Sequence, residues 1–305
     1  MDHGHKLNTA IVGFGRIANT IAEDQKMARY FPLASHSQVI EAHPGFERVA
    51  VVDPAHKWTE KLGEFDADFA VLAIPPEGRL EAVRQIPSLK AVLVEKPMGD
   101  EFLLNYCEKH DIAVHVNFWR RGDAVFRALA DSLEVFVGKP QAVFCTYGNG
   151  LYNNGSHLVD FLRMLLGEVT EVKRTTDPVK LGVMGCSYPN VQDDYHVGFN
   201  LTIGDIPVSV LPLDFEHYRE VGVDIWGTKA RLTLYNEGLA INCYARTAHR
   251  GMERQHEISD QPFSLPTSQE KALYNIYDGI FTGESLSTGR SALETHRVLD
   301  AIIHG

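Results

Sequence analysis

Residues 9–18 read TAIVGFGRIA, and this stretch decides the fold. The apolar run at residues 9–12 is typical of a buried parallel strand, and residues 16–29 carry apolar side chains at helical spacing. The order of strand, glycine turn and helix is the one that the dinucleotide-binding motif requires. Gly13 then allows the tight turn, Gly15 lets the backbone approach a pyrophosphate, and Ala18 lets the helix pack closely on the strand. A corner that binds nothing is the alternative interpretation.

The next strand, at residues 48–52, ends at Asp53. In dinucleotide-binding domains an acidic residue at this place holds the adenosine ribose. Asp53 follows Gly15 by 38 residues, whereas about 20 is usual. We therefore expect residues 31–45 to form an extra turn and a short helix. Asp53 could instead cap the segment that follows it, with Pro54 as the first residue of that segment.

Further strand signals occur at residues 69–74, 91–94 and 112–116, and helical segments separate them. Repeated strand and helix units of this length predict an α/β fold with a doubly wound parallel sheet, which is a Rossmann domain. Ligands bind such sheets at the carboxyl ends of the strands. Because Glu95-Lys96-Pro97 follows one of these strands directly, we expect Lys96 to lie in the site.

The second half of the chain has a different pattern, with short alternating segments punctuated by Gly, Asn and Asp, which is typical of an antiparallel sheet. The segments are residues 141–147, 195–203, 207–213, 222–227 and 230–235. Helices are expected at residues 155–166, 269–281 and 291–303. We therefore predict two domains, at residues 1–120 and 121–305. The polar stretch at residues 246–267 is expected to be a mobile loop near the substrate or an oligomer contact.

Four motifs together resemble the Gfo/Idh/MocA oxidoreductases, which include glucose-fructose oxidoreductase and inositol 2-dehydrogenase. They are the glycine turn, Ala73-Ile-Pro-Pro76, Glu95-Lys96-Pro97 and the segment GLYNNGSHLVD at residues 150–160. The resemblance covers almost the whole chain. It implies a Rossmann domain followed by an α+β domain whose large, mostly antiparallel sheet often serves as an oligomer interface. We therefore expect a homodimer or homotetramer through that sheet.

The resemblance also implies a catalytic site. In this family the lysine of Glu-Lys-Pro lies near the nicotinamide ribose and the reacting carbon, and an Asp-x-x-x-His pair from the second domain completes the site. Here the lysine is Lys96 and the histidine is His157, but the aspartate position holds Asn153. An amide cannot accept a proton as a carboxylate can. A base works best when its pKa lies near the working pH, and the ordinary pKa of histidine does. We therefore expect His157 to be the base and Lys96 to polarise the substrate oxygen.

The cofactor expected is NAD, with NADP not excluded. Its expected contacts are Gly13, Phe14, Gly15, Arg16, Ile17, Asp53, Ile74, Pro75, Glu95, Lys96 and Asn117. The carboxylate of Asp53 favours NAD because it would repel a 2′-phosphate, whereas His56 and Lys57 leave NADP open. The residues expected to contact substrate are Trp119, Arg120, Tyr152 and His157.

Some of these residues have a structural alternative. Asn153 or Asn154 could cap the helix predicted at residues 155–166. His157 and Asp160 lie three apart on that helix, so they could simply pair at the surface. Trp119 could be a packing residue between the domains.

The composition excludes several classes of function. With 44% hydrophobic and 23% charged residues the chain is an ordinary soluble protein, and its net charge of −11 without a basic cluster excludes a nucleic-acid partner. Its four cysteines lack zinc-ligand spacing, so we predict no metal. The absence of a signal peptide and of a membrane-length apolar run predicts a cytoplasmic protein without a membrane contact.

The predicted function is an NAD(P)-dependent dehydrogenase or reductase that acts on the CH–OH group of a sugar, cyclitol or related polyhydroxy compound, free or nucleotide-linked. One alternative is an NAD-dependent glycosidase that works by oxidation and elimination. Another is a non-catalytic NAD(P)-binding regulator of the same fold, for which Asn153 is the motivating residue.

Overall fold

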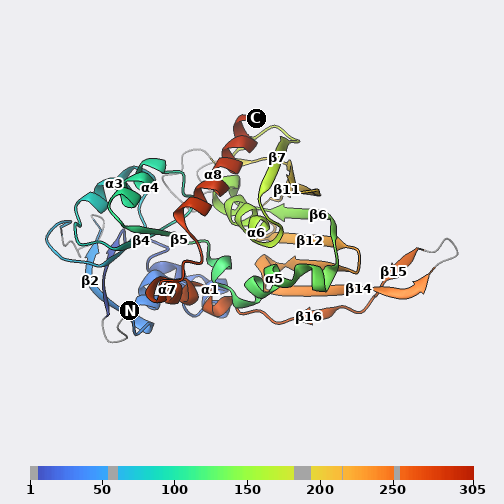
Figure 1. Cartoon of the computed structure of the whole chain (residues 1–305), viewed down its shortest axis with the longest axis horizontal. Helices are drawn as coiled ribbons and strands as arrows, with labels where there is room; N and C mark the ends of the chain where they lie inside the picture. The colour runs from blue at the N-terminus through green and yellow to red at the C-terminus, as the bar shows by residue number, and fades with distance from the viewer. Residues whose placement is uncertain (1–5, 54–60, 182–193, 215, 251–254) are drawn as a thin grey trace. The chain divides into compact units, whose positions relative to one another are not determined.

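The computed structural model describes residues 6–53, 61–181, 194–214, 216–250 and 255–305 of the chain (Figure 1). These residues divide into two compact units. The first contains the described residues up to Ala124 together with Ser268–His296, and the second contains the described parts of Val125–Thr267 and Arg297–Gly305. The units differ from the predicted domains at residues 1–120 and 121–305, because Ser268–His296 belongs to the first unit.

The first unit is built on five parallel strands in the order β2-β1-β3-β4-β5 (Figure 1). The strands are β1 (Leu7–Val12), β2 (Phe46–Val52), β3 (Phe69–Leu72), β4 (Ala91–Val94) and β5 (Ala113–Val116). They are rich in apolar residues, and β3 is buried at all its positions, as expected for a strand that is covered on both faces. All five strands predicted for this half of the chain are confirmed.

Helices cover both faces of this sheet. They are α2 (His36–Ala42), α3 (Pro76–Arg84), α4 (Glu101–Lys109) and α7 (Ala272–Thr282). Val12 packs with residues of α3 and α4 in one core, whereas Ile11 packs with residues of α2 and α7 in another. Consecutive strand residues point to opposite faces, so these two cores lie on the two sides of the sheet. The predicted doubly wound Rossmann fold is confirmed.

The single helix predicted at residues 16–29 is not formed. The turn after Gly15 is followed by a short 3-10 helix, η1 (Thr20–Glu23), and by α1 (Gln25–Tyr30). Asp24 separates them, because its backbone is extended and its carboxylate accepts hydrogen bonds from the first backbone N–H groups of α1. Aspartate prefers such a cap to a helix interior, and this preference outweighs the apolar spacing.

The crossover helix after the glycine turn is α2. The backbone N–H groups of His36 and Ser37 donate to the carbonyls of Ile17 (3.4 Å) and Ala18 (2.9 Å), much as they would if the helix were continuous. Residues 19–35 therefore form an excursion that is inserted between the turn and its helix. The turn and short helix predicted at residues 31–45 are confirmed, since α2 spans His36–Ala42. Most of the surplus between Gly15 and Asp53, however, lies in the excursion at residues 19–35.

The second unit is built on a mixed sheet of nine strands in the order β15-β14-β13-β12-β6-β11-β10-β7, with β16 paired to β14 (Figure 1). They are β6 (Pro140–Tyr147), β7 (Val169–Arg174), β10 (Phe199–Ile203), β11 (Ile206–Pro212), β12 (Val221–Gly227), β13 (Ala230–Tyr235), β14 (Ala240–Arg250), β15 (His256–Ile258) and β16 (Phe263–Leu265). Strands β6 and β11 are parallel, and the other pairs recorded in this sheet are antiparallel. The predicted large, mostly antiparallel sheet is confirmed.

Two predictions for this half were wrong in detail. The strand predicted at residues 195–203 is interrupted, because β9 (Tyr195–His196) pairs with β8 (Val179–Lys180) in a separate small sheet. The loop predicted at residues 246–267 contains the end of β14 as well as β15 and β16, which pair with it. In the described residues the polar composition of this stretch reflects edge strands rather than a loop.

The remaining elements are η2 (Trp119–Gly122), α5 (Ala124–Val137), the π-helix η3 (Gly150–Gly155), α6 (Ser156–Leu166), η4 (Asn236–Gly238), η5 (Gln269–Lys271) and α8 (Gly289–His304). Helices α6, α7 and α8 confirm the three helices predicted after residue 121, whereas α5 was not predicted. None of the helices described combines the length and apolar character that crossing a bilayer requires.

Candidate functional site

In the first unit, hydrogen bonds join the loops that follow the parallel strands. After β1 and β2, the backbone N–H of Phe14 donates to Oδ2 of Asp53 at 2.6 Å. After β3 and β4, the buried guanidinium of Arg79 donates to the carbonyls of Ile74 (3.0 Å) and Pro97 (3.3 Å). The carboxyl edge of the sheet, where folds of this type bind ligands, therefore gathers predicted cofactor residues from four strand ends.

The two glycines of the turn have different surroundings. Gly13 is buried with φ +88°, and a Cβ there would lie 2.5 Å from the carbonyl oxygen of Ala73 and 2.7 Å from Cγ2 of Ile74. Gly15 is exposed, and a Cβ there would meet no atom within 4 Å. The fold therefore requires glycine at position 13, whereas at position 15 glycine leaves the backbone open to an approaching ligand.

Gly15 begins a single turn of helix, which the N–H of Asn19 closes by donating to the carbonyl of Gly15 at 3.0 Å. In the part of the chain that the structure describes, the backbone N–H groups of Gly15, Arg16 and Ile17 donate no hydrogen bond. A row of such donors at the start of a helical turn is suited to an anion. The first-turn amides on which the predicted anion site depends are therefore present, although the long helix expected behind them is not formed.

Asp53 lies beside this turn. Its side chain is buried, and the hydrogen bond from Phe14 fixes one carboxylate oxygen next to the glycine loop. This position agrees with the ribose-holding role predicted for Asp53. The alternative role as a cap concerns residues 54–60, which lie outside the described residues, as do His56 and Lys57, the two residues that left NADP open.

Glu95, directly after β4, is a buried carboxylate with two neighbours that can donate hydrogen bonds. Its Oε1 lies 2.8 Å from Nε2 of His36 and accepts a hydrogen bond from Nδ2 of Asn117 at 2.7 Å. Nδ1 of His36 lies in turn 2.8 Å from the hydroxyl of Tyr277. Burial favours the neutral acid, but the hydrogen bonds from His36 and Asn117 and the charge of Lys96 outweigh it, so the pKa of Glu95 lies below its usual value.

His36 and Tyr277 were not among the residues predicted for the site. His36 is 59 residues from Glu95, and Tyr277 is 241 residues from His36. No local pattern connects positions so far apart in the chain.

Lys96 and Asn117 complete the strand ends of the first unit. Lys96 is buried and precedes Pro97 through a cis peptide bond. Asn117 is also buried, and its Oδ1 has no hydrogen-bond partner among the described residues. A buried acceptor in this state is suited to a donor that a ligand supplies.

Trp119 and Arg120, the predicted substrate residues of the first unit, pack against each other. The guanidinium carbon of Arg120 lies 4.4 Å from the centre of a Trp119 ring, and the ring of Phe31 meets Trp119 edge to face at 5.8 Å. Trp119 is half-buried and Arg120 is buried. Because Phe31 comes from the inserted excursion, this excursion extends from the end of β1 to the loop after β5.

In the second unit, Asp194 holds the turn that carries Asn153 and directly precedes α6, the helix of His157. Its buried carboxylate accepts hydrogen bonds from the backbone N–H groups of Tyr152 (2.9 Å), Asn153 (3.0 Å) and Tyr195 (2.8 Å). Gly150, with φ +89°, leaves room for it, since a Cβ there would lie 2.0 Å from Oδ2 of Asp194. Asp194 thus stabilises the π-helix η3, an element that is common at functional sites.

The side chains on this turn and at the start of α6 are largely enclosed. Asn153 is buried, His157 is half-buried, and the hydroxyl of Tyr152 donates to Oδ1 of Asp300 at 2.9 Å. Burial and the charge of Asp300 raise the pKa of Tyr152 well above its usual value. At neutral pH Tyr152 is therefore a neutral hydroxyl group.

The structure rejects two of the structural alternatives for this segment. The residue before α6 is Gly155 and no side chain caps the helix, so neither Asn153 nor Asn154 is its N-cap. Asp160 is only 1% exposed, so it does not form a surface pair with His157. Among the described residues, no three His, Cys, Asp or Glu side chains are grouped as they would be around a metal ion.

No protein-family model and no curated protein matches the sequence. The fold, however, occurs in solved structures. An oxidoreductase from Agrobacterium radiobacter in complex with NAD+, L-tartaric acid and magnesium is 17% identical, with a TM-score of 0.67, and the match covers 98% of this chain and 97% of that one. The WlbA dehydrogenase from Bordetella pertussis in complex with NADH and UDP-GlcNAcA is 19% identical, with a TM-score of 0.67 and coverages of 98% and 96%.

A third structure with the same fold is that of a super-repressor mutant of Gal80p from Saccharomyces cerevisiae. It is 15% identical, with a TM-score of 0.71, and the match covers 98% of this chain and 95% of that one. The chain therefore has the fold of these proteins over almost its whole length. This confirms the two-part fold expected from the resemblance to the Gfo/Idh/MocA oxidoreductases.

Proposed function

We propose that this protein is an NAD-dependent oxidoreductase that acts on a CH–OH group of a polyhydroxy substrate. The observation that carries the proposal is the glycine turn at the carboxyl edge of the first sheet. There the amides of Gly15, Arg16 and Ile17 have no acceptor among the described residues, while Asp53 lies beside them. Two structures of the same fold, one in complex with NAD+ and one with NADH, support this assignment.

The residues at the carboxyl edge fit a nicotinamide dinucleotide. The amides of the turn are suited to its pyrophosphate, and Asp53 to a ribose with free hydroxyl groups, which favours NAD over NADP. The loops containing Ile74, Pro75 and Glu95 border the same edge, and the unpaired Oδ1 of Asn117 can accept a hydrogen bond from the bound molecule. When bound, the cofactor supplies the position that accepts or donates the hydride.

Side chains of the protein would carry out the proton transfer that accompanies hydride transfer. We assign His157 as the base for the substrate hydroxyl proton and Lys96 as the donor that polarises the substrate oxygen. Asn153 can orient a hydroxyl group but cannot accept its proton. Trp119, Arg120 and Tyr152 stay candidates for substrate contacts. The pairing of Lys96 with His157 in one site is part of the proposal.

A sugar, cyclitol or related acid, free or nucleotide-linked, is the substrate class we propose. The resemblance to Gfo/Idh/MocA oxidoreductases supports this class, as do the L-tartaric acid and UDP-GlcNAcA named with the two related structures. A second candidate function is an NAD-binding regulator without turnover. Asn153 in place of the family aspartate favours it, as does the likeness to a Gal80p repressor variant.

A pair of glycine variants tests the cofactor site. We expect Gly15→Ala to weaken NAD+ binding at least tenfold, because the added methyl group occupies the open side of the turn, while its melting temperature stays within about 2 °C of wild type. Gly13→Ala should instead lower the stability by about 2 kcal/mol or more, through its positive φ and the contact with Ala73. Isothermal titration calorimetry and thermal unfolding measure the two effects. Unchanged NAD+ affinity in Gly15→Ala would place the dinucleotide elsewhere.

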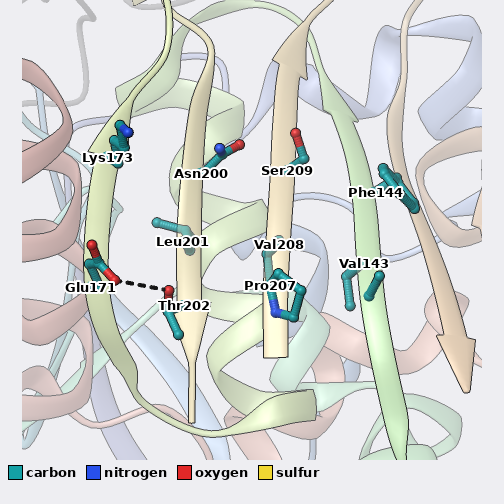
Figure 2. A pocket seen from close by; sticks show the side chains of 11 residues that line it. Val143, Phe144, Glu171, Lys173, Asn200, Leu201, Thr202, Pro207, Val208 and Ser209 are labelled. Atoms are coloured by element: carbon teal, nitrogen blue, oxygen red, sulfur yellow. Dashed lines mark hydrogen bonds between the residues drawn. The ribbon is translucent and has the colours of Figure 1, made fainter. Parts of the chain in front are cut away.

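We also propose that the protein forms a homodimer or homotetramer through the exposed face of the second sheet. A groove of about 360 Å³ crosses β7, β10, β11 and β6 on this sheet (Figure 2). Phe144, Ser209, Asn200 and Lys173 occupy paired positions across these strands and therefore share one face. Phe144 lines the groove and is 54% exposed, so this face presents a large apolar side chain to a partner.

The charges in this groove suit a second copy of the chain. Figure 2 shows Glu171 and Lys173 on the same strand, and the carboxylate of Glu171 accepts a hydrogen bond from Thr202 at 3.4 Å. Around a two-fold axis each copy presents the same surface, so Glu171 of one copy can face Lys173 of the other. An apolar centre with complementary charges beside it is a common composition for such an interface.

Light scattering after size exclusion tests this interface. We expect the wild-type protein to elute as a dimer or tetramer. Phe144→Arg should raise the dissociation constant of this oligomer at least tenfold, because a charge in an apolar interface is costly. Phe102→Arg is the matched control, since Phe102 is 80% exposed on α4 of the first unit. A monomeric wild-type protein, or equal effects of the two variants, would contradict the proposal.

A further inference from the structure

A group of buried polar side chains adjoins the proposed cofactor edge. Glu95 has an exposed fraction of 3%, and His36 and Tyr277 are fully buried. A carboxylate removed from water in this way is costly unless hydrogen bonds and opposite charges compensate for its lost hydration. His36 of α2, Asn117 after β5 and the charge of Lys96 provide that compensation. Tyr277 of α7 in turn contacts His36.

We propose that His36, Tyr277 and Asn117 are positioning residues for Lys96, which act by fixing the carboxylate of Glu95 beside it. This inference rests on the proposed function, since Lys96 is the group that it serves. The contacts form a chain of short distances, from Tyr277 to His36 (2.8 Å), from His36 to Glu95 (2.8 Å), and from Asn117 to Glu95 (2.7 Å).

The hydrogen bonds of this chain have a definite direction. An ionised carboxylate only accepts hydrogen bonds, so Nε2 of His36 must carry a hydrogen toward Glu95. When His36 is neutral, its Nδ1 is then an acceptor and the hydroxyl of Tyr277 donates to it. Burial and the nearby Glu95 raise the pKa of Tyr277 far above its usual value, so this hydroxyl keeps its proton. Tyr277 thereby selects the tautomer of His36 that can bond to Glu95.

The network also links the proposed cofactor site to the inserted excursion. His36 is the first residue of α2, where the crossover helix resumes after residues 19–35. Ser35 caps this helix through a capping box with Gln38, which fixes the start of the helix and therefore the place of His36. The Asn117 side chain, held by Glu95 through Nδ2, keeps its unpaired Oδ1 in one orientation. If Glu95 lost its charge, its hold on the Asn117 side chain would weaken, and Lys96 would lose the negative charge beside it.

The test is the pH dependence of NAD+ affinity, measured by calorimetry on the full chain between about pH 4.5 and 8. In His36→Leu, Glu95 loses the largest of the influences that lower its pKa while its burial is unchanged. The affinity should fall as the pH is lowered, and we expect the midpoint of this fall to lie at least one pH unit higher in His36→Leu than in wild type. Tyr277→Phe should also move this midpoint to higher pH, but by less than His36→Leu does. His36→Gln, which keeps a donor for Glu95, should restore most of the wild-type profile.

His43→Leu is the matched control. His43 is also buried and also contacts α7, through Asp278 at 3.4 Å, but it does not touch Glu95. The His43→Leu variant can therefore lower the stability of the protein without moving the pH profile of NAD+ affinity. Equal profiles for wild type, His36→Leu and His43→Leu would overturn the positioning role and leave the proposed function intact.

A wild-type protein that binds no NAD+ at any pH would instead overturn the proposed function. The network itself then stays testable in the protein without cofactor, by carbon-13 NMR titration of the Glu95 carboxyl. We expect this carboxyl to protonate at least one pH unit higher in His36→Leu than in wild type and to be close to wild type in His36→Gln. Identical titrations in all three proteins would overturn the inference.

Discussion

Replacing Lys96 with alanine lowers kcat for the oxidised polyol or nucleotide sugar by about 10³-fold if Lys96 polarises the substrate oxygen. The variant should bind NAD+ about tenfold more weakly than wild type, because it loses the amine proposed beside the nicotinamide end. Binding should not be abolished, because the amides of Gly15, Arg16 and Ile17 and the carboxylate of Asp53 are untouched. Formation of NADH at 340 nm, in a screen of polyols and nucleotide sugars, measures turnover. His157→Ala should lower kcat by about 10²-fold to 10⁴-fold, since it removes the proposed base.

Lys90→Ala is the control for the loss of a lysine in the same unit. Lys90 precedes β4, whereas Lys96 follows it, and its amine forms an exposed ion pair with Asp68 at 2.7 Å. Exposed pairs contribute little to stability, so this variant should keep wild-type turnover. If Lys96→Ala and His157→Ala both keep every turnover of the wild-type protein, the oxidoreductase proposal is wrong. A protein that binds NAD+ but turns over no compound in the screen would favour the regulator.

Gly150→Ala should destabilise the second unit by about 3 kcal/mol, the second large effect that the structure predicts. The new Cβ would overlap Oδ2 of Asp194 and would also require a left-handed backbone conformation. Displacing Asp194 leaves the N–H groups of Tyr152 and Asn153 without their acceptor, and buried donors without partners are costly. Asp194→Ala should have a similar effect through the same two donors. Chemical denaturation followed by circular dichroism measures both.

Gly167→Ala separates backbone strain from the loss of Asp194. Gly167, at the end of α6, has φ +105°, but a Cβ there would meet no atom within 4 Å. We expect it to cost about 1 kcal/mol, clearly less than Gly150→Ala. If the two glycine variants are equally destabilising, the carboxylate of Asp194 does not hold η3 in the way described here.

The strands of the first unit could be predicted from sequence because both faces of a parallel sheet are buried. Short apolar runs such as residues 69–72 and 91–94 are sufficient to locate them, and a glycine turn after the first strand identifies the nucleotide-binding type. The helix after that turn could not be predicted, since residues 16–29 carry the apolar spacing of a helix. The cap at Asp24 and the bonds from His36 and Ser37 back to residues 17 and 18 depend on the folded chain.

The same limit applies to the site. Residues that follow strands, such as Asp53, Lys96 and Asn117, could be proposed from the sequence because the carboxyl edge of a parallel sheet is known once its strands are known. The residues that hold them were missed. His36 and Asp194 act through contacts with positions 59 and 41 to 42 residues away, and neither lies in a recognisable motif. The assignment of residues 268–296 to the first unit could not be foreseen for a similar reason, because the return of α7 to the first sheet leaves no local signal.

The most direct test of the account is a crystal structure of the protein grown with NAD+. We expect the pyrophosphate at the amides of Gly15, Arg16 and Ile17, the adenosine ribose on the carboxylate of Asp53, and the nicotinamide end beside Lys96 and Asn117. Electron density for the dinucleotide at any other place on the chain, or a structure without it at saturating NAD+, would contradict the account.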